Sequence, residues 1–288
     1  MTKTAWVFPG QGSQAVGMGA DLADVCADRL AEADQILGQS VLEIVQDETL
    51  LNDTRYTQPC LYVVECALAD LLMEKGEQPD VVAGHSLGEY SALYVAGVID
   101  FAAGLRLVKR RAELMSEASE GAMAALMGFK RDELDAKIAE TEGVVLANDN
   151  NPGQVVISGT PEAVDTVLEN VKSKRAVKLN VSGAFHSPLM TDASKAFESV
   201  LVDVSFQDAK FPVMSNVDPT PETKAAALKE RLTKQMTGSV RWREISLSLP
   251  EQGVESVVEV GPGKVLTGLI KRTCKGLPLR NVNSVESV

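Results

Sequence analysis

Short apolar runs alternate with longer stretches of helical spacing along most of the chain. Runs rich in Val, Ala and Phe are typical of buried strands, whereas apolar residues three and four positions apart are typical of helices. The expected strands lie at 4–8, 80–83, 211–215 and 256–260. The expected helices lie at 21–37, 58–75, 87–97, 101–119, 187–202, 221–237, 242–252 and 264–274. This alternation favours a mostly parallel sheet with helices on both faces.

The pattern changes in the middle of the chain, where strands follow one another more closely. The expected order is strand, helix, strand, strand, helix and strand, at 122–129, 132–141, 144–148, 154–158, 161–172 and 175–179. The two central strands form a hairpin around Asn150-Asn151-Pro152-Gly153. This order is the ferredoxin-like split pattern. We therefore expect an α/β fold in two parts: an α/β-hydrolase-like subdomain with a parallel sheet at 1–121 and 184–288, and an inserted ferredoxin-like subdomain at 122–183.

A serine lies between the second expected strand and the helix after it, within Gly84-His85-Ser86-Leu87-Gly88-Glu89-Tyr90. The pattern Gly-x-Ser-x-Gly is weak alone, but a preceding strand and a following helix make it typical of a nucleophile elbow. The glycines allow a sharp reversal that exposes the hydroxyl at a helix N-terminus, where backbone N–H groups can stabilise an oxyanion. We predict that Ser86 is a nucleophile.

A serine nucleophile needs a base, and the chain has two histidines. His85 directly precedes Ser86, so its side chain should leave the turn in another direction. His186 is therefore the predicted general base, by analogy with the serine–histidine template. The alternative is that His186 is a hydrogen-bonded interior residue, which is commoner among histidines. Most acidic residues between Ser86 and His186 fall on surface-like helices of the expected insertion, so no acidic partner for the base stands out.

Three polar residues and one glycine come shortly after expected strands. They are Gln11, Ser86, Asn216 and Gly261. Ligand sites of parallel sheets gather at the carboxyl ends of the strands, so we expect one shared cleft there. Asn148 and Asn216 are candidate hydrogen-bond partners near this cleft, with the capping of turns as the alternative. Gly261 is expected to serve backbone geometry and not chemistry.

Charge narrows the class of partner. The 288 residues carry a formal net charge of −12, which argues against nucleic acid because phosphates require a basic surface. Local basic groups at 172–175 and 264–275 are either patches for an acidic partner or solvated helix faces.

We expect a cytoplasmic protein with neither a membrane segment nor a metal site. The four cysteines show no Cys-x-x-Cys and no histidine at ligand spacing, which favours buried thiols in a reducing compartment. No stretch approaches the roughly 18 consecutive apolar residues of a membrane span. The N-terminus runs directly into a strand pattern, without the character of a signal or transit peptide.

Four motifs together carry a resemblance to a known family. They are Pro9-Gly10-Gln11-Gly12-Ser13-Gln14, the elbow motif, Gly183-Ala184-Phe185-His186-Ser187 and Gly261-Pro262-Gly263-Lys264-Val265-Leu266. In this order, with the insertion between the second and third, they resemble the malonyl-CoA:acyl-carrier-protein transacylase family, the acyltransferases of fatty acid and polyketide synthesis. The resemblance runs from Trp6 to about Cys274.

The resemblance implies the reacting groups. Ser86 is the nucleophile and His186 its base, and the backbone carbonyl of Gln235 orients the histidine where many hydrolases use a carboxylate. The backbone N–H groups of Gln11 and Leu87 form the oxyanion hole. A carbonyl-oriented histidine suffices because a thioester has a good leaving group.

The resemblance also implies the acyl-binding groups. Arg111, which lies 25 residues after Ser86, matches the arginine that binds the malonyl carboxylate. Arginine suits this role because it stays charged and binds a carboxylate bidentately. Spacing alone does not select it over Arg106 and Arg110, since at about 100° per residue these side chains cannot all face the cleft. Phe185 resembles the malonyl-selective form of its motif and should exclude branched methylmalonyl groups.

The implied reaction moves malonyl from malonyl-CoA to the phosphopantetheine thiol of acyl carrier protein through a malonyl-serine ester, in ping-pong order. The resemblance implies a monomer that needs no cofactor. A free-standing chain favours fatty acid synthesis, with a polyketide carrier protein as the alternative. A serine thioesterase or esterase, in which water replaces the carrier thiol, also stays open. A degenerate docking module is disfavoured because Ser86 and His186 are both present.

Overall fold

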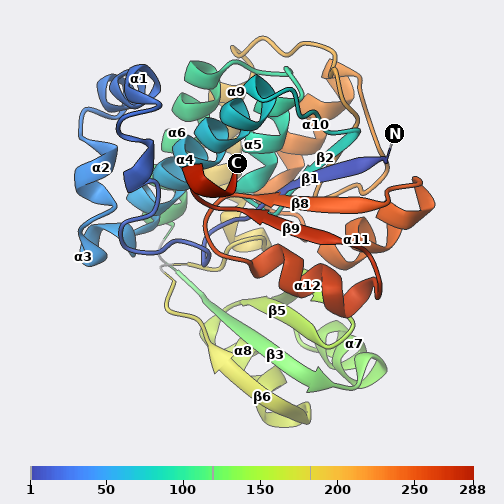
Figure 1. Cartoon of the computed structure of the whole chain (residues 1–288). Coiled ribbons are helices and arrows are strands. Elements are labelled where there is room, and N and C mark those ends of the chain that lie inside the picture. Colours follow the sequence, from blue (N-terminus) through green and yellow to red (C-terminus); the bar gives the residue numbers. More distant parts are fainter. Residues whose placement is uncertain (1, 119, 182) are drawn as a thin grey trace.

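A computed structural model describes residues 2–118, 120–181 and 183–288. Its larger sheet has five parallel strands in the order β7-β2-β1-β8-β9 (Figure 1). These strands are β1 Thr4–Phe8, β2 Val81–Gly84, β7 Val213–Met214, β8 Ser256–Val260 and β9 Leu279–Val282. The expected parallel sheet is confirmed, and β9 is a fifth strand that the hydrophobic pattern did not indicate.

Helices cover both faces of this sheet, as the alternation of apolar residues along β1 requires. Trp6 and Phe8 face one hydrophobic cluster, whereas Ala5 and Val7 face a second. The first face packs against helices that include α1 Ala27–Leu37, α4 Thr54–Glu74, α5 Gly88–Val95, α6 Phe101–Glu117, α9 Thr191–Leu201 and α10 Ala225–Gln235. The second packs against α11 Trp242–Glu251 and α12 Val265–Thr273.

The middle of the chain forms the smaller, antiparallel sheet, in the order β4-β5-β3-β6. Its elements are β3 Ala122–Phe129, α7 Arg131–Glu140, β4 Val144–Asn151, β5 Gln154–Gly159, α8 Pro161–Asn170 and β6 Ser173–Lys178. One face of this sheet buries Leu126 and Ile157 with residues of α7 and α8. The other face adds Met123 and Val156 to the main cluster of the larger part. The sheet therefore docks on the rest of the molecule, at the bottom of Figure 1.

Several helix bounds differ from the expected ones for local reasons. The helix expected at 21–37 is a 3-10 turn, Ala20–Leu22, followed by α1. The helix expected at 187–202 begins as a second 3-10 turn, Pro188–Met190. The helix expected at 221–237 starts only at Ala225, because Glu222 pairs with Val213 through two backbone hydrogen bonds. The expected last residue of α6, Ser119, lies outside the described residues.

Three further short elements complete the described chain, and the hydrophobic pattern indicated none of them. They are α2 Val41–Ile44, α3 Glu48–Leu51 and a 3-10 turn at Val285–Ser287. Within the described residues, no helix combines the length and apolar character needed to cross a membrane.

Candidate active site

The turn between β2 and α5 holds Ser86 in a strained backbone conformation. Ser86 has φ 53°, in the left-handed region that side chains other than glycine rarely adopt. The glycines on either side are needed for space. A Cβ on Gly84 would lie 1.9 Å from the carbonyl oxygen of Gly88, and a Cβ on Gly88 would lie 2.1 Å from that of Phe8. The close approach of β1, β2 and α5 thus produces the elbow.

Ser86 and His186, which are 100 positions apart, meet at this turn. Ser86 Oγ lies 2.8 Å from His186 Nε2. His186 Nδ1 lies 3.0 Å from the carbonyl oxygen of Gln235 and 3.1 Å from that of Gly238. Carbonyl oxygens only accept, so Nδ1 carries the proton and Nε2 accepts from the serine hydroxyl. This tautomer is the one that a general base requires.

Burial sets the protonation state of the histidine. Loss of hydration and the nearby charge of Arg111 together lower the pKa of His186 to about 3. The two carbonyl hydrogen bonds act in the opposite direction and do not offset this effect. His186 is therefore neutral at physiological pH and free to accept a proton.

Arg111 on α6 is a buried cation whose hydrogen-bond partners are all uncharged. Its Nη2 donates to Ser86 Oγ at 3.0 Å and to Gln235 Oε1 at 3.1 Å, and its Nη1 donates to Gln58 Oε1. Burial lowers the pKa of this guanidinium from its ordinary value. Among the described residues, no carboxylate oxygen accepts a hydrogen bond from this cation, which favours the binding of an anion beside Ser86.

The neighbouring arginines of α6 point elsewhere. Arg106 is exposed, and Arg110 is half-buried and pairs with Glu113 at 3.0 Å. Arg111 is thus the arginine of this helix that reaches the serine, as its helical position permits.

A cavity of about 90 Å³ contains these groups. Its polar wall includes Ser86, His186 and Arg111, and its apolar wall comes from both parts of the fold. The apolar residues are Leu87, Met115, Met123, Leu179, Val181 and Phe185. Gln11 and Asn148 also line the cavity. This volume suits an acyl group of a few heavy atoms and is well below the pocket size of a drug-sized ligand.

The two predicted oxyanion donors lie at the cavity. The side chain of Gln11 accepts a hydrogen bond from the Thr54 hydroxyl at 2.7 Å, which anchors its loop to α4. Among the described residues, no acceptor takes the backbone N–H of Gln11 or of Leu87. Both N–H groups are thus available to an oxygen of a bound substrate.

The two candidate asparagines differ in their surroundings. Asn148 lines the cavity, and its buried Oδ1 has no hydrogen-bond partner among the described residues. Asn216 is buried beneath the elbow, where its Oδ1 accepts from Ser86 N at 2.7 Å and its Nδ2 donates to Gly84 O at 2.5 Å. Its amide is used by the backbone of the turn, which is the structural alternative to a contact with substrate.

The sequence prediction assigned no role at the site to three further polar residues. Gln58 holds Arg111, and Glu89 lies fully buried under the elbow. His85 Nε2 lies 2.8 Å from Asn150 Oδ1 on β4, so the residue before the nucleophile contacts the smaller sheet. A polar residue inside a buried apolar helix was the available signal for Gln58, because such groups need a polar partner.

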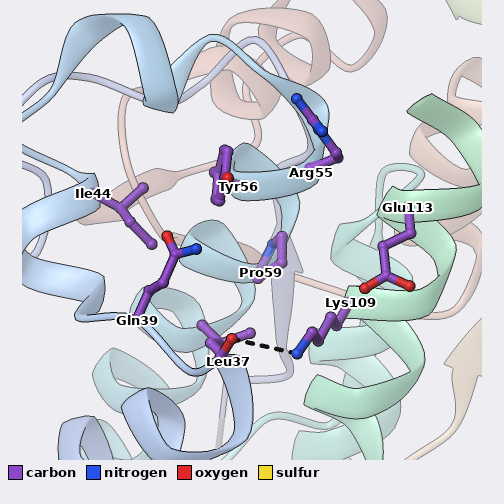
Figure 2. A pocket seen from close by; sticks show the side chains of 8 residues that line it. All are labelled: Leu37, Gln39, Ile44, Arg55, Tyr56, Pro59, Lys109 and Glu113. Carbon is purple, nitrogen blue, oxygen red and sulfur yellow. Dashed lines mark hydrogen bonds between the residues drawn. The ribbon is translucent and has the colours of Figure 1, made fainter. Parts of the chain in front are cut away.

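A second cavity, of about 260 Å³, lies between α1, α2, α4 and α6 (Figure 2). Its charged groups already have partners. Lys109 donates to the carbonyl oxygens of Ile36 and Leu37, Arg55 pairs with Asp53, and Glu113 pairs with Arg110. It contains no serine or histidine, so the smaller cavity is the candidate active site. Within the described residues, no group of three or more His, Cys, Asp or Glu is arranged to hold a metal ion.

Comparison with known proteins gives consistent matches over the whole chain. The acyl transferase domain family matches residues 5–288. A malonyl CoA-acyl carrier protein transacylase from Synechocystis is 58% identical over 289 residues, covering 99% of both chains. A Bacillus subtilis protein of the same name is 41% identical over 303 residues, covering 100% of this chain and 96% of that one.

Solved structures match as closely. The crystal structure of the Synechocystis malonyl-CoA:ACP transacylase superposes with a TM-score of 0.97 at 58% identity, covering 99% of this chain and 98% of that one. A malonyl-transacylase in complex with a type II polyketide acyl-carrier protein superposes with a TM-score of 0.94 at 42% identity, covering 99% and 97%.

Proposed function

The chain belongs to the acyl transferase family, and from this premise we propose that it transfers malonyl from malonyl-CoA to the phosphopantetheine thiol of an acyl carrier protein. One observation carries the proposal. Ser86 Oγ contacts both the neutral base His186 and the buried cation Arg111, at 2.8 and 3.0 Å. This geometry provides a nucleophile together with a receptor for an acyl group that ends in a carboxylate.

In the first half-reaction, Ser86 Oγ attacks the thioester carbonyl of malonyl-CoA while His186 Nε2 accepts its proton. The backbone N–H groups of Gln11 and Leu87 stabilise the oxyanion of the tetrahedral intermediate. The intermediate collapses with rupture of the carbon–sulfur bond, and His186 returns the proton to the departing sulfur. Malonyl remains on Ser86 as an ester, and CoA leaves as a thiol.

Arg111 selects the acyl group during this step. The free carboxylate of malonyl accepts the guanidinium hydrogen bonds, which compensates the buried charge. Phe185, which lines the cavity, limits the space beside the α-carbon and disfavours a branched acyl group. Asn148 has a free buried oxygen at the same cavity, which suits a donor group of the substrate.

In the second half-reaction, the carrier thiol enters the same cavity and His186 Nε2 removes its proton. The thiolate attacks the ester carbonyl, the carbon–oxygen bond to Ser86 breaks, and His186 reprotonates the serine. The chemistry uses the side chains of the chain and its two substrates, so we propose that no cofactor takes part.

We further propose a cytoplasmic monomer that supplies fatty acid synthesis. The four free cysteines are consistent with a reducing compartment. The match to the Synechocystis malonyl CoA-acyl carrier protein transacylase, at 58% identity over 99% of both chains, supports the fatty acid role over that of the polyketide relatives, which are 43% and 42% identical. We also propose that 122–183 is a subdomain inserted into the part formed by 1–121 and 184–288.

The test measures malonyl transfer and malonyl-CoA hydrolysis with and without acyl carrier protein. We expect rapid transfer to the carrier, slow hydrolysis, and loss of both with Ser86→Ala. Hydrolysis that equals transfer would identify a thioesterase instead. Transfer that persists in Ser86→Ala would contradict the covalent mechanism.

A further inference from the structure

Glu89, on the first turn of α5, is buried beneath the elbow, yet the reaction proposed above does not use it. One of its carboxyl oxygens accepts two hydrogen bonds. Glu89 Oε2 accepts from Gln235 Nε2 at 2.8 Å and from the backbone N–H of Asn216 at 3.1 Å. Oε1 is buried and has no partner among the described residues. A buried carboxyl group costs free energy, which its two hydrogen bonds offset in part.

The two donors hold the backbone of the nucleophile from both sides. Asn216 Oδ1 accepts from the N–H of Ser86 at 2.7 Å. Gln235 Nε2 donates to the carbonyl oxygen of Ser86 at 2.8 Å. Both peptide groups of a residue with φ 53° are thereby fixed by side chains that are themselves tied to Glu89. A strained backbone conformation persists only when its surroundings determine it in this way.

Glu89 also determines which way the Gln235 amide faces. The carboxyl oxygen that faces Gln235 accepts, so the amide nitrogen of Gln235 points toward it and the amide oxygen points away. That oxygen accepts from Arg111 Nη2 at 3.1 Å, and the backbone carbonyl of the same residue accepts from His186 Nδ1 at 3.0 Å. A flipped amide would direct its NH₂ group at a guanidinium, where two donors meet. The serine, its base and the arginine therefore share one anchor.

We propose that Glu89 is the positioning residue of this active site, holding Ser86, His186 and Arg111 in register through Asn216 and Gln235. The inference rests on the proposed function for the roles of those three residues. Its physical basis is positional: a displacement of about 1 Å of a reacting group can cost roughly 100-fold in rate. Glu89 itself touches no reacting atom.

Two substitutions at Glu89 test whether the site requires the carboxyl group itself or only a hydrogen-bond acceptor at the Oε2 position. Glu89→Gln keeps an oxygen at the Oε2 position and places its NH₂ group at the position of Oε1, where no contact is lost. Glu89→Ala removes the acceptor. We expect Glu89→Ala to lower the rate of malonyl-serine formation by about 100-fold. Glu89→Gln should rescue that rate to within about threefold of the wild type, because the interaction required is a hydrogen bond to an acceptor.

A matched control lies elsewhere in the same core. Glu65 on α4 is likewise fully buried, has one unpartnered oxygen, and accepts from Ser91 Oγ of α5 at 2.6 Å. Glu65→Ala should lower the melting temperature but leave the rate per folded molecule unchanged. Equal rate losses in Glu65→Ala and Glu89→Ala would overturn the proposal, because both would then reflect a weakened core. Equal losses in Glu89→Gln and Glu89→Ala would also overturn it.

Labelling of Ser86 by methanesulfonyl fluoride, followed by mass spectrometry, separates this inference from the proposed function. The reagent is small and uncharged and needs neither malonyl nor a carrier protein. Slow labelling of Glu89→Ala supports the positioning role even if the wild type fails to accept malonyl. Labelling at the wild-type rate overturns the role even if malonyl transfer is confirmed. If Glu89→Ala does not fold, Glu89→Asp, which withdraws the acceptor by one methylene, takes its place in each comparison.

Discussion

Burial makes His186 a base that stays neutral well into the acidic range. A histidine in water titrates near pH 6.5, but the pKa of His186 is lowered to about 3. A solvated base would lose activity as it becomes protonated on the acidic side of neutrality. The pH dependence of serine reactivity therefore reports how well the site excludes water.

We expect the rate of Ser86 labelling by methanesulfonyl fluoride to stay nearly constant between about pH 5 and 8. A fall centred near 6.5 would show that His186 is hydrated and would contradict the buried geometry.

The lowered pKa of His186 also affects stability, because this histidine binds a proton near pH 6.5 in the unfolded chain and only near pH 3 in the folded chain. The free energy of unfolding should therefore decrease as the pH falls from 6.5 toward 3, and His186→Gln should weaken that dependence.

Arg111 should determine the preference for an acyl group with a carboxylate. Removal of the guanidinium would leave the malonyl carboxylate buried without a cation, at a cost in binding free energy on the order of 3–5 kcal/mol. Arg111→Ala should therefore lower kcat/KM for malonyl-CoA by at least about 100-fold. Transfer of uncharged acetyl should persist or rise. The control is Arg110→Ala, which changes the adjacent half-exposed cation and should affect neither substrate. Equal losses of malonyl and acetyl transfer would exclude the carboxylate-binding role.

Individual residues also show how far sequence reasoning reaches at this site. Motif context indicated Ser86 and His186, and the structure brings them within hydrogen-bond distance. Family resemblance indicated Arg111 and the carbonyl of Gln235. It did not indicate the side chain of Gln235, which contacts Ser86, Glu89 and Arg111. Contacts between residues so far apart in the chain depend on packing, which no local pattern encodes.

At the scale of elements, the elbow depends on backbones in direct contact. A Cβ at Gly88 would lie 2.1 Å from the carbonyl oxygen of Phe8, so β1 and α5 would have to separate. Gly88→Ala should therefore destabilise the protein by several kcal/mol, in the range of severe core changes. The midpoint of urea unfolding measures this loss.

Gly268→Ala is the matched control for that substitution. Gly268 lies within α12, and a Cβ there would meet nothing within 4 Å. Alanine should stabilise this helix by about 0.5–1 kcal/mol. A Gly88→Ala variant as stable as the wild type would show that the elbow tolerates a side chain.

Hydrophobic patterning predicted long helices and buried strands well, and edge elements poorly. The bounds of β1 and β8 match the expected ranges because four of the five residues in each strand are buried. By contrast, β9 has one fully buried residue of four, so its composition resembles a loop. Its partner β8 determines its conformation through parallel pairing, and only the folded chain reveals that contact.

At the scale of the whole molecule, β4 connects the smaller sheet to the larger part through backbone hydrogen bonds and ion pairs. Asp149 N donates to Val240 O at 2.9 Å, and Val240 N donates to Ala147 O at 2.8 Å. The buried Asp149 Oδ2 accepts from Arg131 on α7 and Arg243 on α11, each at 3.0 Å. One carboxylate thus joins helices from both parts next to the cavity wall.

Asp149→Asn should weaken this junction by about 1–3 kcal/mol, since it leaves two cations that share one neutral partner. Thermal unfolding measures the loss. Asp135→Asn is the control, because Asp135 pairs with the same Arg131 but is half-exposed. An exposed pair contributes at most about 1 kcal/mol, so the control should lie near the wild type. Equal shifts in the melting temperature of the two variants would show that the contacts of Asp149 stabilise the junction no more than an exposed ion pair does.

The small cavity around Ser86 also shapes how the enzyme behaves in a mixture of thiols. With about 90 Å³ beside the serine, the thiols of CoA and of the carrier protein cannot occupy the site together. Free CoA and the unloaded carrier protein must then compete for the same acylated form. Steady-state assays should show CoA as a competitive inhibitor against the carrier, and a non-competitive pattern would contradict a site that the two thiols share. The rate of malonyl transfer to the carrier would then depend on the ratio of malonyl-CoA to free CoA, so the enzyme would respond directly to the supply of its own substrate.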